Sequence, residues 1–358
     1  MIGARAIVAL GSLAATLALS GCGAVELYWQ GLTGQVDILA RAKPIPEVIE
    51  STNDPALKDR LARAQAIRAF ASRELALPDN RSYTSYADLG RAFVLWNVFA
   101  APELSLTPRQ WCFPVAGCVN YRGYFAESEA RAEAARLAAQ GDDVFVGGVP
   151  AYSTLGYFDD PVLSTFARYR EVEFARLIFH ELGHQVVYVK DDTSFNESFA
   201  VTVEEEGVAR WLAYEAKRRD PADAQRLAAD FERGQRTRAD FREMIGAARE
   251  RLDAIYASPA SDDEKRAAKA AVFAEMRADN EHQRKALGAP TAFDRWFEAG
   301  ANNAGIAAAG LYADRVPQFK ALLKEEGGDL ARFYERVRVL AALPRGEREL
   351  ALAQAARS

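Results

Sequence analysis

The chain has 358 residues, which is enough for a large hydrophobic core and one or two domains. Its 49% hydrophobic and 27% charged residues are typical of a globular protein. A formal net charge of −5 argues against a nucleic-acid-binding protein, because such proteins carry basic faces. Beyond the N-terminus, no apolar run reaches the roughly 20 residues that a membrane-spanning helix needs.

Residues 1–21 have the pattern of an export signal. One basic residue, Arg5, precedes the apolar stretch AIVALGSLAATLALS, and Gly21 and Cys22 follow it. This end resembles the lipobox of bacterial lipoproteins, in which Cys22 becomes the acylated first residue of the mature chain. Because Gly23 rather than Asp follows, the resemblance implies an exported lipoprotein on the periplasmic side of the cell envelope, anchored in the outer membrane. The alternative is an ordinary secretory signal, in which Cys22 is an unmodified thiol.

Helical and strand patterns alternate along the first half of the mature chain. Apolar spacing, prolines and glycines set the expected boundaries. The expected elements are a helix over 25–41, an amphipathic helix over 54–77, strands over 93–100 and 119–124, and a helix over 127–139.

The stretch from 142 to 219 is expected to carry the chemistry. We expect a strand with glycine kinks over 142–163, then a helix from Pro161, where proline is tolerated, to about Tyr188. A loop over 191–198 and a helix over 196–219 follow it.

The second half reads as helical throughout. The charged, alanine-rich block 222–287 predicts two long helices in a hairpin, packed on one face and solvated on the other. Helices are also expected over 290–345. The predicted fold class is therefore α+β, predominantly helical, with a single unit over 22–358 and its catalytic core in 120–215.

Cys112 and Cys118 in WCFPVAGCV are the cysteines that remain besides Cys22. In an oxidising compartment, two thiols this close predict a disulfide that closes a tight loop. Chain entropy gives such a short loop about 2 kcal/mol of stabilisation. A metal site is the competing interpretation, but no histidine is nearby and there is no second cysteine pair.

The stretch LIFHELGHQVVYV contains two of the chain's 3 histidines, His180 and His184, with Glu181 between them. Residues four apart lie on one face of a helix, so both imidazoles can bind one ion. Glu181 lies close enough to hold a water on that ion, which is the arrangement of the H-E-x-x-H motif. The alternative, a pair of core histidines, would bury two imidazoles and a carboxylate at high cost. The stretch therefore predicts a metal site.

A catalytic zinc site needs one more protein ligand and one open position. A histidine at the metzincin position would fall on Lys190, and His282 lies in the charged hairpin, so a carboxylate is expected. Glu197 in FNESFA, at the start of the next helix, is the favoured ligand. Glu204 is expected to support a ligand or to face the substrate. The competing carboxylates are Asp191, Asp192, Glu205 and Glu206.

HELGH followed by NESFA resembles the gluzincin arrangement, in which the Glu of N-E-x-F-A completes H-E-x-x-H. The spacing is shorter than in the zinc aminopeptidases of that group, and their G-x-M-E-N element is absent. The closer resemblance is to a family of bacterial lipoproteins known as putative aminopeptidases. It is carried by WCFPVAGCVNYRGYF, AYSTLGYFDDPVL, HELGHQ, FNESFAVTVEEEG and NNAGIAAAGLY. The resemblance implies a zincin-like metallopeptidase core with one Zn²⁺ per chain, and it supports peptidase activity more than exo-action.

Further roles follow from this chemistry. Zinc would lower the pKa of bound water from about 15.7 toward 7, with Glu181 as the base that later protonates the departing amine. Related gluzincins use a phenol from a later helix, which makes Tyr312 the candidate donor to the oxyanion.

Two segments are candidates for contact with the substrate. AYSTLGYF is expected to be an edge strand whose main chain pairs with the peptide; a core strand with a glycine bulge is the alternative. Asn302 and Asn303 either bind substrate or tie the C-terminal helices to the site. The residues of the expected edge strand are Tyr152, Ser153, Thr154, Leu155 and Gly156.

The predicted function is a zinc metallopeptidase of the cell envelope, with an aminopeptidase favoured. Its partners would be peptide substrates and, through the lipid alone, the membrane. The alternatives are a zinc endopeptidase, another zinc amidohydrolase, or a non-catalytic envelope lipoprotein that retains the scaffold. Glu181 argues against the last, because a binding scaffold needs no base. The choice between exo- and endo-action depends on whether the hairpin over 222–287 closes one end of the cleft.

Overall fold

The fold comes from a computed structural model. It describes residue 31 and residues 33–113, 117–151, 153–288, 290–291, 293–309 and 315–355. The export signal and Cys22 lie outside these residues, as do Tyr152 and Tyr312. Of the expected helix over 25–41, residues 31 and 33–41 are described and are helical.

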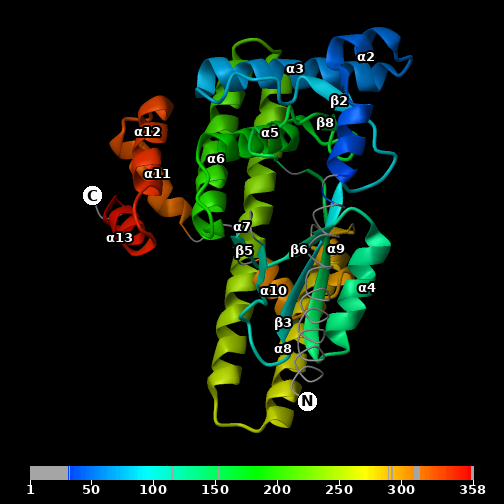
Figure 1. The fold of residues 1–358 in the computed structure, drawn as a ribbon, viewed down its shortest axis with the longest axis vertical. Coiled ribbons are helices and arrows are strands. Elements are labelled where there is room, and N and C mark those ends of the chain that lie inside the picture. The colour runs from blue at the N-terminus through cyan, green and yellow to red at the C-terminus, as the bar shows by residue number, and fades with distance from the viewer. Residues whose placement is uncertain are drawn as a thin grey trace, which may run out of the picture.

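Helices dominate the described chain, and short strands form three small sheets (Figure 1). The fold is thus predominantly helical α+β, as the sequence predicts. No helix in the described ranges combines the length and the apolar character needed to cross a membrane. The helices are α2 (Ile45–Ser51), α3 (Pro55–Leu75), α4 (Glu127–Ala138), α5 (Glu171–Val186), α6 (Thr193–Ala216), α7 (Pro221–Ala257), α8 (Asp262–Leu287), α9 (Asp294–Glu298), α10 (Asn303–Ala309), α11 (Val316–Glu325), α12 (Leu330–Ala341) and α13 (Arg345–Ala355).

The central sheet has the strand order β6-β3-β7, and β3 pairs antiparallel with both neighbours. A second sheet has the order β1-β2-β8, and β4 and β5 form a two-stranded hairpin. The strands are β1 (Lys43–Pro44), β2 (Ser85–Ala87), β3 (Leu95–Pro102), β4 (Trp111–Phe113), β5 (Gly117–Val119), β6 (Arg122–Tyr124), β7 (Asp142–Val149) and β8 (Val162–Leu163).

The two faces of the central sheet carry different helices. Side chains alternate between the faces along β3. Val98 lies in an apolar cluster with Leu137 of α4. Phe99, on the other face, lies in a separate cluster with Ala304 of α10. The sheet is therefore a layer between α4 and α10, and the face that carries Phe99 is the one that meets the cavity described below.

The main core is built where α5 and α6 pack against each other and against α3. Phe179 of α5, Phe199 and Trp211 of α6, and Phe70 of α3 are all buried there. Gly207 permits this contact, because a Cβ at this position would meet the ring of Phe179 at 2.7 Å. Close packing of this kind fixes the relative position of the two helices that carry the candidate metal ligands.

Helices α7 and α8 form the long antiparallel pair expected over 222–287, and their connecting turn projects away from α2 and α3 (Figure 1). His282 is exposed on α8, as expected from its charged surroundings. The start of α7 is different in character, because it packs against α5 and α6. The hairpin is therefore attached to the core rather than separate from it.

Two predicted helix starts are wrong, and the strand expected over 142–163 ends at Val149. The helix expected from Pro161 begins ten residues later, at Glu171, because Val162 and Leu163 extend alongside Tyr86 and Ala87 as a parallel strand. The helix expected from Asn196 begins at Thr193, because Asp192 accepts the N–H of Phe195 as an N-cap. The N-cap is a local signal, since Asp192 and Phe195 are three residues apart, whereas the strand pairing depends on a tertiary contact that the local pattern does not contain.

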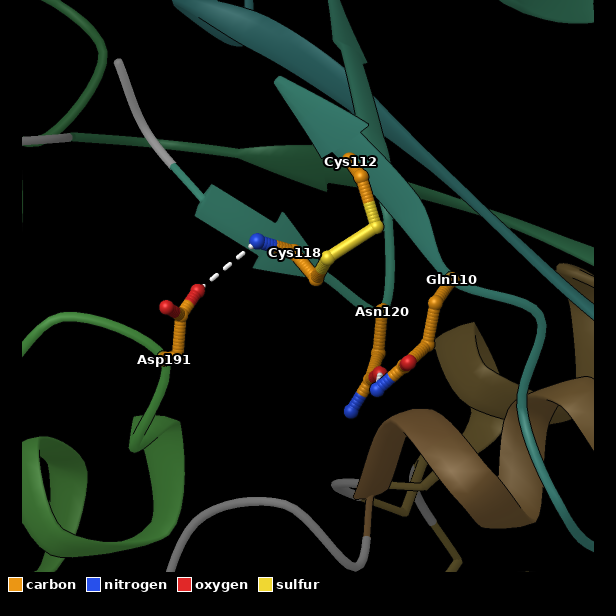
Figure 2. Close-up of a disulfide and its surroundings, with 5 residues drawn as sticks. All are labelled: Gln110, Cys112, Cys118, Asn120 and Asp191. Atoms are coloured by element: carbon orange, nitrogen blue, oxygen red, sulfur yellow. Dashed lines mark hydrogen bonds between the residues drawn. A yellow bond between two sulfur atoms is a disulfide. The ribbon is translucent and has the colours of Figure 1, made fainter. Parts of the chain in front are cut away.

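The predicted disulfide between Cys112 and Cys118 is confirmed, and it links β4 to β5 (Figure 2). The backbone N–H of Cys118 donates a hydrogen bond of 2.8 Å to Oδ1 of Asp191, in the loop between α5 and α6. This hairpin therefore braces the connection between the two helices of the core.

Candidate metal centre and adjoining cavity

His180, His184 and Glu197 lie together, with one possible ligand atom of each within 4.8 Å of the others. The two Nε2 atoms are 3.1 Å apart. Glu197 places Oε2 at 3.3 Å from Nε2 of His180 and Oε1 at 3.7 Å from Nε2 of His184. Tetrahedral zinc with bonds of 2.0–2.1 Å requires ligand atoms about 3.3 Å apart. The spacing of the three donors therefore fits one tetrahedral ion.

The protonation of His180 follows from its second ring nitrogen. Nδ1 lies 2.9 Å from Oε2 of Glu204, which is only 2% exposed and also accepts a hydrogen bond of 2.8 Å from Nε of Arg176. A carboxylate held in this way favours the proton on Nδ1, which leaves the lone pair of Nε2 directed at His184 and Glu197. The imidazole is thus oriented as a ligand.

The electrostatics of the three donors favour a positive charge between them. Burial alone would lower the pKa of His180, but Glu197 and Glu204 outweigh it and hold that pKa well above the ordinary value. Burial and the charge of His180 lower the pKa of His184 to about 4. Burial alone would raise the pKa of Glu197, but His180 and His184 hold it below its usual value. A bound cation would supply the positive charge that Glu197 and Glu204 otherwise obtain from a proton on His180.

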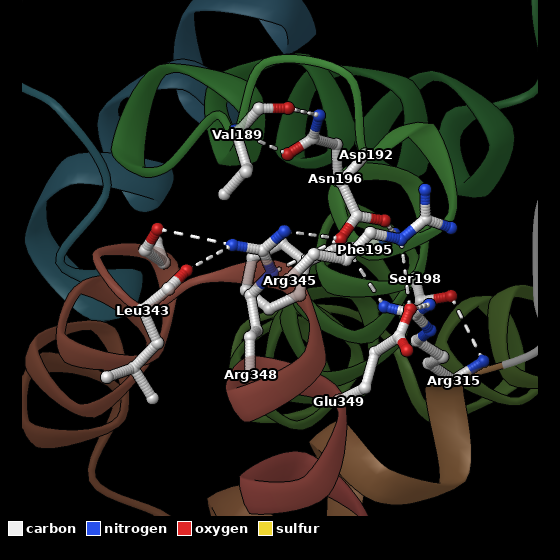
Figure 3. Close-up of polar contacts among 11 residues, drawn as sticks. Val189, Asp192, Phe195, Asn196, Ser198, Arg315, Leu343, Arg345, Arg348 and Glu349 are labelled. Atoms are coloured by element: carbon white, nitrogen blue, oxygen red, sulfur yellow. Dashed lines mark hydrogen bonds and ion pairs between the residues drawn. The ribbon is translucent and has the colours of Figure 1, made fainter.

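Residues next to Glu197 fix the N-terminus of α6, and Figure 3 shows the contacts that Asn196 and Asp192 make there. Asn196, buried to 2% exposure, donates to the carbonyl of Val189 and accepts its N–H, each at 2.7 Å. Asp192 caps the helix and accepts a hydrogen bond of 2.8 Å from Nη2 of Arg348 in α13. The Asn of N-E-x-F-A is therefore a clamp on the loop between α5 and α6.

Glu181 follows His180 directly on α5, roughly 100° further around the helix. Burial raises the pKa of its carboxyl to about 7, His180 opposes this rise, and Glu197 adds to it. Among the described residues it has no hydrogen-bond or ion-pair partner. A carboxyl with a pKa close to neutrality can both accept and donate a proton at physiological pH.

Tyr121 is a residue that the sequence reasoning missed. Burial raises the pKa of its phenol to about 12, and the neighbouring charges of Glu197, Tyr188 and Glu181 add to this. The phenol therefore lies near the candidate ligands from the sheet side and remains a hydrogen-bond donor at neutral pH. Its ring packs against Phe99 of β3, with centroids 5.7 Å apart. Its place in VNYRGYF was visible in the sequence, but the pattern gave no reason to prefer it among 13 tyrosines.

The expected edge strand at Tyr152–Gly156 is wrong for the residues that the structure describes. Ser153, Thr154, Leu155 and Gly156 form a turn, in which Leu155 and Gly156 have φ of 56° and 82°. The buried carboxylate of Asp160 organises this turn by accepting the N–H of Thr154 at 2.9 Å. A left-handed backbone cannot continue a strand, so this segment offers no straight edge to a peptide.

Of the two roles predicted for Asn302 and Asn303, their contacts fit the structural one, in which they tie the C-terminal helices to the rest of the fold. Asn302 donates a hydrogen bond of 2.8 Å to the carbonyl of Val144 in β7. Asn303 is fully buried, donates to the carbonyl of Glu103 at 2.8 Å and accepts the hydroxyl of Tyr256 at 2.7 Å. These bonds tie α10 to the sheet and to α7, and a buried Asn303 is not accessible to a substrate.

A cavity of about 510 Å³ lies near the three donors, none of which lines it. Glu204 and Arg176 form part of its wall, so it begins at the carboxylate that holds His180. Asn97 and Phe99 of the sheet line it from one side, and Phe241 of α7 lines it from another. The sequence did not predict this cavity, because its walls come from segments more than a hundred residues apart.

Comparison with known proteins gives one match. A family model described as putative aminopeptidase matches residues 26–352, which is most of the chain. No curated protein and no solved structure matches the chain.

Proposed function

The chain belongs to the putative aminopeptidase family, and from this premise we propose that it is a zinc metallopeptidase that cleaves peptide bonds. His180, His184 and Glu197 would hold one Zn²⁺. Glu181 would act as the general base. The family points to peptide hydrolysis in general, and its description favours removal of N-terminal residues.

The observation that carries this proposal is the convergence of three donors. Two imidazole nitrogens and a carboxylate lie 3.1, 3.3 and 3.7 Å apart. Two histidines and one glutamate form a known type of catalytic zinc site that leaves one coordination position open. Structural zinc sites usually fill all four positions with protein ligands, so a set of three favours catalysis over a structural role.

The residues of this chain divide the proposed chemistry among them. When bound, zinc would act as a Lewis acid that lowers the pKa of water and polarises the scissile carbonyl. Glu181 accepts the proton of the attacking water and later donates it to the departing amine, which its pKa of about 7 permits. Glu204 orients His180, and the neutral phenol of Tyr121 would donate a hydrogen bond to the substrate's oxygen.

The proposed location is the periplasmic side of the cell envelope, with a lipid on Cys22 as the only membrane attachment. The apolar stretch before Leu19-Ser20-Gly21-Cys22 supports this. The disulfide between Cys112 and Cys118 agrees with an oxidising compartment.

The test combines metal analysis with two kinds of substrate. Purified protein should contain about one zinc per chain, and it should hydrolyse aminoacyl-anilides or internally quenched peptides. Cleavage of free-amine substrates alone would establish an aminopeptidase, and cleavage of blocked peptides would establish an endopeptidase. Zinc-loaded protein that cleaves neither class would overturn the proposal.

A further inference from the structure

We infer that the cavity of about 510 Å³ beside the three donors is a subsite that receives an aromatic side chain of the peptide, next to the bond that is cleaved. The inference rests on the proposed function, because it names the class of substrate. It goes beyond that function by assigning a specificity and the residues that set it.

Glu204 connects the cavity to the metal centre, although none of the three donors lines the cavity. Glu204 lines it and, through Oε2, lies 2.9 Å from Nδ1 of His180. Arg176 also lines it and precedes His180 by one turn of α5. A side chain next to a scissile bond at the metal would therefore have this cavity within its reach.

Aromatic rings form the walls. Phe99 and Phe145 extend from neighbouring strands of the sheet, with ring centroids 6.2 Å apart. Phe241 of α7 and Trp296 of α9 face each other edge to face, with centroids 5.8 Å apart. An incoming aromatic ring could make the same offset and edge-to-face contacts, which add about 0.5–1.5 kcal/mol to area burial. The shape and chemistry of these walls favour Phe, Tyr or Trp over a small or charged side chain.

A polar group on the sheet points to the peptide main chain. Asn97 of β3 lines the cavity, is only 8% exposed, and its Oδ1 is buried with no hydrogen-bond partner among the described residues. Its partners across the sheet are Gly123 and Gly147, so no side chain opposite it can satisfy the amide. A buried acceptor without a partner costs about 1–3 kcal/mol. The backbone N–H of a bound peptide would supply the missing donor.

The charges at the cavity select against basic side chains. Arg176 pairs with Glu204, and Arg238 pairs with Glu173 at 3.0 Å. Glu205, which also lines the cavity, pairs with Lys320 at 2.6 Å. Arg242 is exposed at the cavity and has no ion-pair partner among the described residues. A lysine or arginine side chain entering here would meet an unpaired positive charge and lose its hydration, so the site discriminates by repulsion as well as by fit.

The first experiment measures kcat/KM for internally quenched peptides and aminoacyl-anilides that differ at one position beside the scissile bond. Phe should exceed Ala by about tenfold or more, and Lys should be the poorest. Thr237 lines the cavity from α7 and is half-buried, so Thr237→Trp should fill it without removing a core side chain. This variant should lose the preference for Phe, with kcat/KM for the Phe substrate falling to about that for the Ala substrate. Ala239→Trp, at an exposed position of the same helix, should behave as the unsubstituted protein.

The second experiment needs no catalysis. Calorimetric titration of the zinc-loaded protein with N-acetylphenylalanine amide and with N-acetyllysine amide should detect binding of the aromatic compound alone, and Thr237→Trp should abolish it. Aromatic binding without hydrolysis of any peptide would refute the proposed function and leave the subsite standing. Hydrolysis without a preference for Phe, or a preference that survives Thr237→Trp, would overturn the subsite.

Discussion

Oε2 of Glu204 lies 2.9 Å from Nδ1 of His180, so a carboxylate on α6 fixes the orientation of an imidazole on α5. Outer partners of this kind raise the basicity of the ligand and typically change metal affinity by about 10–100-fold when they are removed. We therefore expect Glu204→Gln to weaken zinc binding by about this factor, as measured by competition with a chromophoric chelator.

Glu206→Gln is the matched control for this change. Glu206 lies two residues further along α6, where it pairs with Arg210 at 2.8 Å near the surface. Its loss should leave zinc affinity unchanged. Equal affinities for the two variants would show that Glu204 does not orient His180.

The second prediction tests whether Glu181 acts as the general base without being a metal ligand. Glu181→Gln keeps the size of the side chain and removes its ability to accept a proton. Because general acid–base catalysis contributes about 10²–10⁴-fold, kcat should fall by this factor while zinc content stays at one per chain. Metal analysis and peptide turnover on the same preparation test both statements, and undiminished turnover would remove Glu181 from the proposed mechanism.

The candidate donors could be predicted from the sequence because helical periodicity determines them. His180 and His184 are one turn apart whatever the rest of the fold does, and Glu197 lies near the start of the next helix after a short loop. The disulfide between Cys112 and Cys118 could likewise be predicted, because the two cysteines are only six residues apart.

The cavity and Tyr121 could not be predicted in this way. Asn97 faces the cavity without a side chain on either neighbouring strand beside it, because the register of β3 places it opposite Gly123 and Gly147. That register involves long-range pairing, which no local pattern specifies. The same limitation explains the helix wrongly expected from Pro161, since β8 forms only when β2 lies beside it.

Asn196 gives a third prediction, about the loop between α5 and α6. Its side chain makes two hydrogen bonds of 2.7 Å with the main chain of Val189. Asn196→Ala removes both hydrogen bonds from a partly buried N–H and carbonyl, so at about 0.5–1.5 kcal/mol each we expect a loss of about 1–3 kcal/mol in the free energy of unfolding. Weaker zinc binding should accompany it, because the next residue is Glu197. Urea titration and chelator competition measure the two effects.

Asn196→Asp provides a graded comparison for the same position. It keeps an acceptor for the N–H of Val189 but places a carboxylate against the carbonyl that the amide formerly donated to. If the clamp is correct, both variants are destabilised; stability equal to that of the unsubstituted protein in either would contradict it.

The disulfide gives a fourth prediction. Reduction of Cys112–Cys118 should lower the free energy of unfolding by about 2 kcal/mol, because the loop that it closes is short. Denaturant titration with and without a reductant measures this difference. A variant with both cysteines replaced by serine should have the lower stability in both conditions, and any sensitivity of that variant to the reductant would point to another cause.

The last prediction concerns the ion pair that joins α13 to the start of α6 (Figure 3). Arg348 and Asp192 are 4% and 3% exposed, and two nitrogens of the guanidinium contact Oδ2 of Asp192, at 2.8 and 3.2 Å. Removing one partner of a buried pair costs about 3–5 kcal/mol, because the other charge stays buried without compensation. Arg348→Met should approach this loss in urea titration, reduced by the second cation that Arg315 places 3.5 Å from the same carboxylate.

Arg345→Met tests whether burial is the cause. Arg345 lies three residues earlier in α13 and pairs with Glu349 at 3.1 Å, but its side chain is 66% exposed. Exposed pairs contribute about 0–1 kcal/mol, so this variant should differ little from the unsubstituted protein. Because Asp192 caps the helix that carries Glu197, Arg348→Met should also weaken zinc binding and Arg345→Met should not. A destabilised Arg348→Met with unchanged zinc affinity would mean that the cap supports the fold without positioning the ligand.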